Sequence, residues 1–321
     1  MPDSKPLVTI GAINYNNEKH VIETLDSIAN QTYENIELIV VDDASTDNSL
    51  TLIKDWLKNY KKPYKLIVHS ENMNVHAGYM SVIKNATGEF LSIVATDDVL
   101  VNEKTEKQVE AFANLGDEYG AVYGDVIQID EIGKIINNSQ FESIRKENSN
   151  WTLPKGDLFN YLVFSWIFSV QSSLFRKSIL KDFYFPEKYI CEDWYFYLYV
   201  AKQAKISGIE VLCVLYRRHS ESITGNFSKS LSNHLWVLSN IHIFFHISKF
   251  SDLSTKQLTR INVMYQEQIV KYAQQQKSSY IIALKEWFRT WQLPQKKHQL
   301  YSLWYINWYF IKKLFGYKLP F

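Results

Sequence analysis

The sequence predicts an α/β protein with a mostly parallel central sheet flanked by helices, followed by a C-terminal helical extension. In the first half, apolar runs rich in Val, Ile and Leu alternate with stretches whose apolar residues recur at helical spacing. This alternation is typical of buried parallel strands connected by helices. Two of the apolar runs end in acidic pairs, Asp42-Asp43 and Asp97-Asp98. Because open α/β sheets bind ligands at the carboxyl ends of their strands, these pairs predict a ligand site.

The elements follow in order along the chain. We expect strands over residues 7–12, 36–41, 64–69, 90–95 and 121–129. We expect helices over residues 21–29, 50–57, 76–85 and about 104–115. Ser45-Thr46-Asp47 offers side-chain oxygens that can cap the second helix. From about Glu131 the pattern becomes irregular, with a hairpin turn at Ile132-Gly133, and beyond about residue 228 the sequence predicts helices.

Composition bounds the class of protein. The 321 residues are 46% hydrophobic and 21% charged, as in globular proteins, and a net charge of +1 argues against a nucleic-acid partner. The cysteines, Cys191 and Cys213, lack metal-site spacing and are expected to be buried free thiols in a reducing cytosol. The polar start has no signal-peptide pattern, and no apolar stretch reaches about 20 residues, so we expect a cytoplasmic protein.

The last 35 residues differ from the rest. From Trp287 onward there are six Lys or Arg residues, no Asp or Glu, and twelve aromatic residues. Aromatic rings among basic side chains suit the headgroup layer of a membrane. The alternatives are a helix that packs on the remainder of the chain and a contact in a homo-oligomer. We expect a division into residues 1–225 and residues 226–321, with the second part contacting a membrane surface or a partner subunit.

Several motifs together resemble those of the family 2 glycosyltransferases. The motifs are V-T-I-G-A-I-N-Y-N at 8–16, Q-T-Y at 31–33, V-V-D-D-A-S-T-D at 40–47, A-T-G-E-F at 86–90, A-T-D-D at 95–98, E-D-W at 192–194 and Y-R-R-H-S-E-S at 216–222. The resemblance covers about residues 7–225 and rests on the order and spacing of the motifs. It implies a GT-A fold in residues 1–225 and an inverting enzyme that uses a nucleotide sugar.

The resemblance assigns the first acidic pair to the nucleotide. It implies that Asp43 accepts a hydrogen bond from the uracil imide, that Ile13 and Tyr15 flank the base, and that Asp97 contacts the ribose. The expected donor is therefore a UDP-sugar. The alternative for Asp43 is a turn or helix cap at Ser45-Thr46. Its neighbour Asp42 is expected to brace the loop.

The second acidic pair resembles the metal-binding DXD element of the family. Oxygen ligands suit Mg²⁺ or Mn²⁺, which usually retain substrate phosphate oxygens as further ligands. By resemblance, Asp98 is the metal ligand and His219 reaches the metal or the diphosphate, while Arg217 and Arg218 add positive charge at the phosphates. Ala95 departs from the pattern, because many relatives have an Asp there. The alternatives are a strand-end turn for the acidic pair and a structural role for the histidine.

The motif at 192–194 resembles the acceptor side of these enzymes. An inverting transfer needs a base that takes the proton from the acceptor hydroxyl, and the matching residue is Asp193. Glu192 is expected to hold the acceptor, Trp194 to form an apolar platform for a sugar ring, and Gln171 to lie near the acceptor pocket. Acidic residues at this point also suit the N-terminus of a helix, and that reading is compatible with the first.

The expected function is transfer of a single sugar from a UDP-sugar to a glycan, on a lipid-linked acceptor at the inner membrane face, in O-antigen or capsule assembly. The Q-x-x-R-W element of processive synthases is missing, as are dinucleotide and P-loop motifs. One rival is a nucleotidyltransferase, which usually has a Gly-rich basic loop where this chain has residues 14–18. The other is a non-catalytic glycan-binding relative, which the retained acidic pairs argue against.

Overall fold

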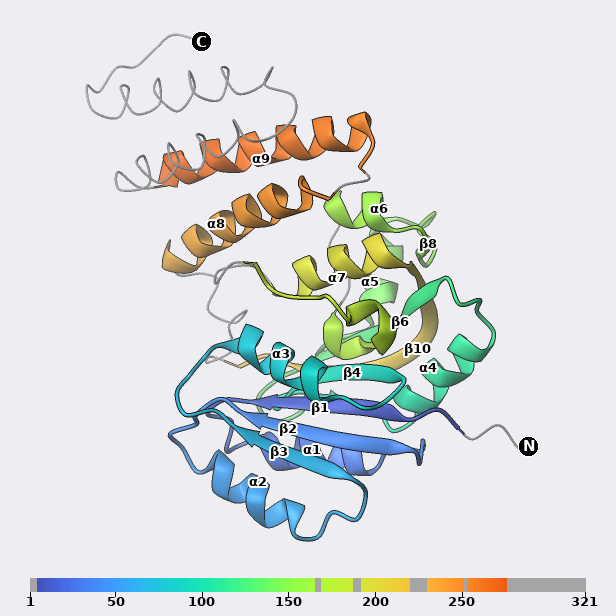
Figure 1. Cartoon of the computed structure of the whole chain (residues 1–321), viewed down its shortest axis with the longest axis vertical. Coiled ribbons are helices and arrows are strands. Elements are labelled where there is room, and N and C mark those ends of the chain that lie inside the picture. Colours follow the sequence, from blue (N-terminus) through green and yellow to red (C-terminus); the bar gives the residue numbers. More distant parts are fainter. Residues whose placement is uncertain (1–4, 165–168, 187–191, 220–229, 251–252, 276–321) are drawn as a thin grey trace. The chain divides into compact units, whose positions relative to one another are not determined.

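The computed structural model describes residues 5–164, 169–186, 192–219, 230–250 and 253–275 (Figure 1). The chain divides into two compact units. The first comprises Met1–Tyr184 and Glu192–Ser220, and the second comprises Phe185–Cys191 and Glu221–Phe321. The predicted site residues lie in the first unit, whereas the aromatic and basic tail from Trp287 lies outside the described residues.

The first unit is built on one mixed sheet. Its strands are β1 (Val8–Asn14), β2 (Ile36–Asp42), β3 (Tyr64–Val68), β4 (Phe90–Ala95), β5 (Val99–Leu100), β6 (Tyr119–Ile129), β7 (Ile135–Asn137), β8 (Lys155–Gly156), β9 (Ser173–Arg176) and β10 (Lys205–Arg217). The order is β3-β2-β1-β4-β9-β6-β10-β5, with β7 paired to β6 and β8 to β10. The strands from β3 to β4 are parallel, and so are β6 and β10. β1 therefore lies between the two strands that carry the acidic pairs at their ends.

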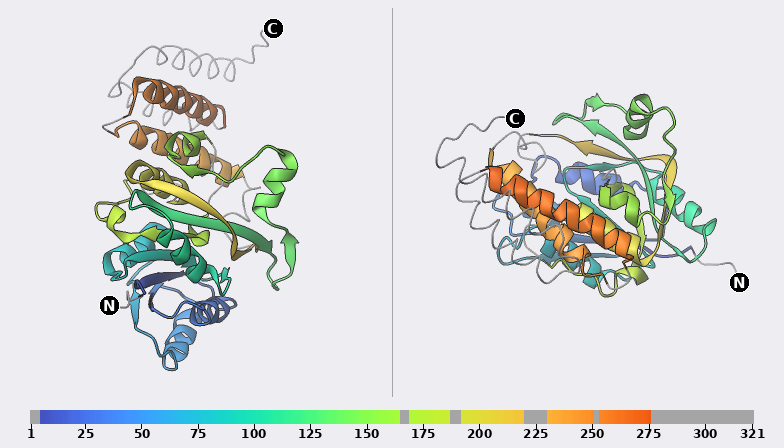
Figure 2. Two further views of the ribbon diagram at one scale, coloured as in Figure 1. Left: turned by 90° about the vertical axis from the view of Figure 1, so that its right-hand side faces the viewer. Right: turned by 90° about the horizontal axis from the view of Figure 1, so that it is seen from above.

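Helices cover both faces of this sheet. They are α1 (Val21–Ala29), α2 (Ser49–Leu57), α3 (Val75–Asn85), α4 (Lys104–Ala113), α5 (Gln140–Glu147), α6 (Phe159–Phe164) and α7 (Glu192–Gln203). The chain passes from β1 through β2 to β3 in one direction and returns by α3 to β4. Because parallel crossovers are right-handed, α3 lies on the face opposite α1 and α2, as Figures 1 and 2 show.

Two glycines allow α3 to pack closely on β1. A Cβ atom added at Gly11 of β1 would lie 2.3 Å from Cγ1 of Val82. A Cβ atom added at Gly78 of α3 would lie 2.7 Å from Cγ2 of Ile13. Both distances are far shorter than ordinary carbon contacts of about 3.5–4.0 Å, so the backbones approach through these glycines. The close approach fixes α3 beside the carboxyl end of β1.

Most of the predicted elements are confirmed. The strand at residues 90–95 and the helix at residues 21–29 have the predicted limits, and the other predicted elements differ by one or two residues at their ends. Five strands of the sheet were not among those predicted, namely β5, β7, β8, β9 and β10, and of these β9 lies antiparallel between β4 and β6. Of the three residues predicted to cap the second helix, Asp47 contributes: α2 begins at Ser49, and the Ser49 amide donates a hydrogen bond to Asp47 Oδ1 at 3.0 Å.

The described part of the second unit consists of two helices, α8 (Ser230–Ile247) and α9 (Thr255–Gln275), as predicted for the region beyond residue 228. They pack against each other, and the rings of Phe245 and Tyr265 lie 6.2 Å apart. Among the described residues, no helix combines the length and the apolar character needed to cross a bilayer.

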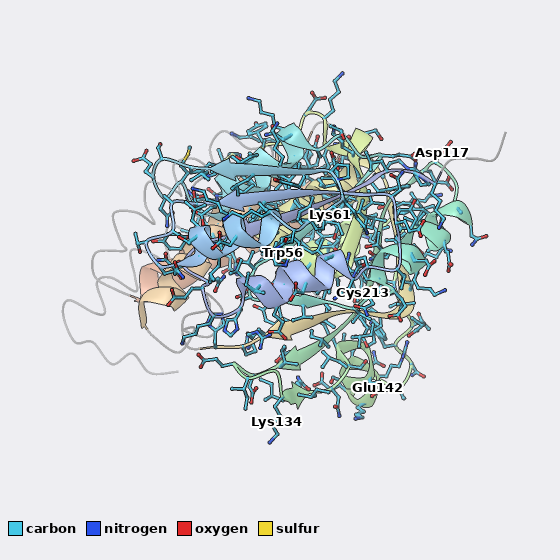
Figure 3. All side chains as sticks on the ribbon, turned by 90° about the horizontal axis from the view of Figure 1, so that it is seen from below. Trp56, Lys61, Asp117, Lys134, Glu142 and Cys213 are labelled. Atoms are coloured by element: carbon cyan, nitrogen blue, oxygen red, sulfur yellow. The ribbon has the colours of Figure 1, made fainter. Side chains whose placement is uncertain are left out.

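Cys213 is the free thiol that the sequence predicted, buried in β10, whereas Cys191 lies outside the described residues. Burial raises the pKa of the Cys213 thiol to about 12. Figure 3 shows Cys213 enclosed by the elements of the first unit, in contrast to Lys134, which projects outward from the turn between β6 and β7. A buried thiol with a raised pKa is a poor nucleophile, so Cys213 acts as a core residue.

Candidate active site

A polar network joins the carboxyl ends of β1, β2 and β4. Asn14 Nδ2 donates to Asp42 Oδ2 at 2.8 Å and to Ser45 Oγ at 3.0 Å, and its Oδ1 accepts from Thr96 Oγ1 at 2.7 Å. The Ser45 amide donates to Asp42 Oδ1 at 3.0 Å. Asp42 is completely buried and its oxygens are occupied by these contacts, so it braces the loop as predicted.

Asp43 is held in place by residues from three segments of the chain. Its amide donates to the Asn14 carbonyl at 2.9 Å. Its Oδ1 accepts from the Met73 amide at 2.9 Å and lies 2.6 Å from His69 Nδ1. His69 Nε2 in turn lies 2.9 Å from Ser81 Oγ on α3. The alternative role as a cap at Ser45-Thr46 belongs to Asp42 instead, which accepts from the Ser45 amide.

Two large apolar side chains next to Asp43 are exposed. Tyr15 is 45% exposed and follows Asn14, which binds Asp43, while Met73 is 49% exposed and its own amide binds Asp43. Exposed apolar groups beside a fixed carboxylate suit the faces and the edge of a nucleobase. Ile13 is 8% exposed and lies under Gly78, so little of it is accessible at this site. The sequence does not predict a role for Met73 at this site, because its proximity to Asp43 depends on a contact between separate segments of the chain.

Asp97 and His219 form the second cluster. Nε2 of His219 lies 3.1 Å from Oδ2 of Asp97, and the side chains are 9% and 18% exposed. The ring of His20, at the start of α1, lies 5.7 Å from the His219 ring. Burial is the largest effect that lowers the pKa of His20, followed by the charge of Arg217. No motif in the sequence singles out His20, whose ring comes near His219 only through the fold.

Asp98 lies beneath this cluster and is 1% exposed. Its Oδ1 accepts from the Arg217 amide at 2.8 Å, while its buried Oδ2 has no hydrogen-bond partner among the described residues. Burial, followed by the charge of Asp97, raises the pKa of Asp98 well above its usual range, and Asp193 contributes in the same direction. The structure thus turns Asp97, rather than Asp98, toward His219.

The sequence predicts Arg217 at the phosphates of the donor, but its side chain is buried and bound within the fold. Its side chain is 1% exposed and its guanidinium donates to the backbone carbonyls of Asp97, Asp130 and Glu131 at 2.8–3.2 Å. It also forms an ion pair with Glu23 at 2.6 Å. Through these contacts, Arg217 fixes the turn at Asp97 to α1 and to the hairpin that follows β6.

Asp193 lies in the first turn of α7 and contacts two other segments. Its Oδ1 accepts from the Tyr79 hydroxyl on α3 at 2.8 Å, and its Oδ2 lies 3.5 Å from the Val170 amide. Burial raises the pKa of Asp193 to about 6, against the opposing effect of the Tyr79 hydrogen bond. A carboxyl group with this pKa is ionised at neutral pH and still a useful proton acceptor. The Tyr79 contact was not predicted from the sequence.

The predicted acceptor residues divide into three cases. Gln171 follows Val170 in the 3₁₀ turn Val170–Ser172, and its Oε1 accepts from Ser169 Oγ at 2.5 Å, so it lies near Asp193. Trp194 is 7% exposed and its Nε1 donates to the Leu162 carbonyl of α6 at 2.7 Å. The predicted sugar platform is therefore wrong for Trp194, whose ring is part of the core. Glu192 begins α7, and its side chain lies outside what the structure describes.

The chemistry of Asp97 and His219 fits a divalent cation that also binds substrate. In the described parts of the chain, no three or more His, Cys, Asp or Glu side chains form a ready metal site. Mg²⁺ and similar ions are commonly held by one or two protein carboxylates, with water and phosphate oxygens completing the shell. A carboxylate and an imidazole that already lie together meet that requirement, and the neighbouring Asp98 has a buried Oδ2 with no hydrogen-bond partner among the described residues.

The chain is similar in sequence to a known family of proteins. Residues 9–183 match the family model described as glycosyl transferase family 2. EpsE of Bacillus subtilis, which bears the name of a glycosyltransferase, is 34% identical over 131 residues, or 41% of this chain and 47% of EpsE. The matched region thus spans about half the length of EpsE. WfgD of Escherichia coli, named a UDP-Glc:α-D-GlcNAc-diphosphoundecaprenol β-1,3-glucosyltransferase, is 26% identical over 234 residues, or 72% of this chain and 85% of WfgD.

The fold is also found in solved structures. A crystal structure of residues 1–349 of S. aureus TarS matches with a TM-score of 0.67 at 20% identity, covering 98% of this chain and 93% of that one. The same TarS fragment in complex with UDP-GlcNAc matches with a TM-score of 0.59. The comparisons favour a glycosyltransferase over the nucleotidyltransferase and the non-catalytic relative. Because the family model matches more than half of its length, the chain belongs to glycosyl transferase family 2 and is a glycosyltransferase with the GT-A fold.

Proposed function

We propose that this glycosyltransferase adds a single sugar from a UDP-sugar to a hydroxyl group of a lipid-linked glycan, with inversion at the anomeric carbon, during synthesis of a cell-surface polysaccharide. The observation that carries the proposal is the place of Asp193. Burial raises the pKa of its carboxyl group to about 6. Its negative charge contributes to raising the pKa of Asp98, which is adjacent in sequence to Asp97 of the Asp97–His219 pair. The residue proposed as proton acceptor and the cluster proposed to bind phosphate are therefore close enough to interact electrostatically.

In this proposal, Asp43 accepts a hydrogen bond from the imide N–H of uracil. His69 and the Met73 amide occupy its Oδ1, which leaves Oδ2 for the base. Tyr15 packs on the base, and Ile13 supports it from below as a mostly buried residue. A carboxylate can only accept, so it disfavours cytosine, whose corresponding ring nitrogen is also an acceptor.

Asp97 and His219 would hold Mn²⁺ or Mg²⁺, and Asp97 would also lie near the ribose. The cation supplies neutralisation of the negative charge that develops on the leaving diphosphate. The sequence predicts Asp98 and His219 as the metal ligands; we propose Asp97 in place of Asp98, because Asp97 Oδ2 lies 3.1 Å from His219 Nε2 whereas Asp98 Oδ1 accepts from the Arg217 amide. We propose that Asp98 supports the cluster from beneath.

Asp193 acts as the general base of the transfer. It takes the proton of the acceptor hydroxyl while the hydroxyl oxygen forms a bond to the anomeric carbon. The bond from that carbon to the phosphate oxygen breaks, and its electron pair leaves with UDP. Attack opposite the leaving group inverts the anomeric centre. Gln171 and Glu192, which adjoin Asp193 through the 3₁₀ turn and the start of α7, are proposed to contact the acceptor.

The acceptor class rests on the relatives. WfgD is named for transfer of glucose to a GlcNAc diphospholipid, and TarS has been crystallised with UDP-GlcNAc. We propose a similar lipid-linked acceptor, used in O-antigen or capsule assembly at the inner face of the cytoplasmic membrane. The aromatic and basic segment from Trp287 is proposed to contact that membrane or a second copy of the chain.

The test is transfer from UDP-Glc or UDP-GlcNAc to synthetic GlcNAc-α-diphosphoundecaprenol with Mn²⁺, measured as UDP release and as product mass. We expect transfer from one of the donors. We expect Asp193→Asn to lower the rate roughly a hundredfold or more, because a general base contributes about that much, while UDP still stabilises the variant. The exposed change Asp55→Asn on α2 is the control. Normal transfer by Asp193→Asn would overturn the base assignment, and no product from either donor would overturn the proposed substrates.

A further inference from the structure

Tyr79 has a buried hydroxyl group that takes no proton in the proposed transfer. It lies on α3, is 4% exposed, and donates its phenolic proton to Asp193 Oδ1 at 2.8 Å. The two residues are 114 positions apart in the chain. Since an ionised carboxylate can only accept, the hydroxyl must be the donor in this bond. The contact therefore stabilises the ionised form of Asp193 from a separate helix.

The tyrosine ring is itself fixed in position. It packs edge-to-face against Phe196 of α7, with centroids 5.8 Å apart and an interplanar angle of 73°. Phe196 is completely buried and packs in the same manner against Phe175 and Phe183, each with a centroid separation of 4.9 Å. Edge-to-face contacts of this kind orient aromatic rings as well as stabilise them. The hydroxyl therefore approaches Asp193 from one set direction.

The two carboxylate oxygens of Asp193 are held unequally. Oδ1 has the Tyr79 bond of 2.8 Å, whereas the Val170 amide is 3.5 Å from Oδ2, beyond the usual length of an N–H···O bond. A carboxylate anchored through one oxygen can present the other to a reactant. This asymmetry distinguishes the oxygen that is used for orientation from the oxygen that is available for proton transfer.

We infer that Tyr79 is a positioning residue that anchors Asp193 through Oδ1 and leaves Oδ2 as the atom that receives the acceptor proton. This inference rests on the proposed function of Asp193 as the base. Tyr79 does not exchange its proton in the step: the acceptor O–H bond breaks, the proton bonds to Oδ2, and the phenol keeps its own hydrogen. Loss of the phenol makes the charged carboxylate less stable and less well oriented.

The experiment compares Tyr79→Phe with a matched control, Tyr33→Phe. Both tyrosines are buried and both donate a hydrogen bond from the phenol, but Tyr33 donates to the Pro6 carbonyl, which precedes the amino end of β1. The carboxyl titration of Asp193 is followed by NMR in protein labelled with ¹³C at the aspartate carboxyl carbon, and the signal absent from Asp193→Asn identifies the residue. The pH dependence of kcat is measured with the donor and acceptor of the transfer assay.

For Tyr79→Phe, we expect the Asp193 titration and the acid limb of kcat to move upward by about one pH unit, as for loss of a hydrogen bond to a charged group. We expect no movement in Tyr33→Phe. An unchanged Asp193 titration in Tyr79→Phe would overturn the inference. The proposed function fails separately: if Asp193→Asn transfers sugar normally, the titration can still shift in Tyr79→Phe, but Asp193 is not the base.

Discussion

Nε2 of His219 lies 3.1 Å from Oδ2 of Asp97, although 122 residues separate the two in the chain. The contact joins the end of β10 to the turn after β4, and it places an imidazole and a carboxylate where the diphosphate of a donor is proposed to bind. Oδ1 of the neighbouring Asp98 accepts instead from the Arg217 amide. The two adjacent acidic residues can therefore be separated by experiment.

We expect Asp97→Asn to weaken Mn²⁺-dependent stabilisation by UDP by about tenfold or more in apparent affinity, because it removes a charged ligand. Asp98→Asn should retain most of the effect, since an amide oxygen can still accept from the Arg217 amide. Thermal unfolding with UDP, with and without Mn²⁺, measures both. The exposed change Asp117→Asn serves as the control. Loss of the metal effect in Asp98→Asn alone would favour Asp98 as the ligand.

The rate of transfer should depend on pH through Asp193. Burial raises the pKa of its carboxyl group to about 6, and the base must be ionised to accept a proton. We expect kcat to be nearly constant above pH 7 and to fall about tenfold for each pH unit well below 6. A pH–rate profile at saturating donor and acceptor measures this. An acid limb centred near pH 4 would indicate a base with an ordinary carboxyl pKa.

Glu37 is predicted to stabilise the fold in its ionised form. Burial would raise its pKa, but hydrogen bonds from Thr9, Thr87 and the Gly88 amide outweigh this effect and hold the pKa below its usual value. A carboxyl group with a depressed pKa in the folded state stabilises the fold above its unfolded pKa and loses that contribution as pH falls through the folded pKa.

Glu37→Gln should therefore lower the free energy of unfolding at pH 7 by on the order of 1 kcal/mol, with a smaller difference below about pH 4. Urea unfolding of wild type and variant at the two pH values measures the change. The control is Glu110→Gln, which removes an exposed ion pair with Lys107 and should change stability by less than about 0.5 kcal/mol. An equal effect of Glu37→Gln at both pH values would contradict the prediction.

Lys104 is completely buried, and burial lowers its pKa to about 8. Its Nζ donates to Ser92 Oγ, Gln108 Oε1 and the Ser173 carbonyl at 2.8–3.1 Å, all of them uncharged acceptors. Between pH 8 and the usual lysine pKa, the unfolded chain binds more protons than the folded one, so this residue makes stability rise with pH. The urea midpoint of the wild type minus that of Lys104→Met should therefore increase from pH 8 to pH 10, because only the wild type gains stability through Lys104. Lys61→Met, an exposed control, should show no such growth.

The sequence predicted the elements of the sheet better than the directions of individual side chains. Runs such as residues 90–95 are apolar throughout, so their limits are visible without knowledge of the fold. Adjacent residues Asp97 and Asp98 lie in the turn that follows, and which of them faces the cluster depends on the path of that turn and on β10. Periodicity alone contains no information on that choice.

The contacts of Asp193 show the same distinction. Its place at the start of a helix follows from the acidic residues at that point of the sequence. Its partner Tyr79 lies on another helix, in a segment whose pattern identifies it only as a helical apolar position. Trp194 was expected at a surface because aromatic residues often bind sugars, but its place on the inward side of α7 follows from packing against α6.

The close packing of α3 on β1 through Gly11 and Gly78 has a consequence for tolerance to mutation. The same helix supports Asp43 through Ser81 and His69, and it supports Asp193 through Tyr79. A side chain introduced at either glycine would lift the helix and disturb both carboxylates at once. A single substitution that contacts neither substrate would then lower both the affinity for the donor and the rate of turnover.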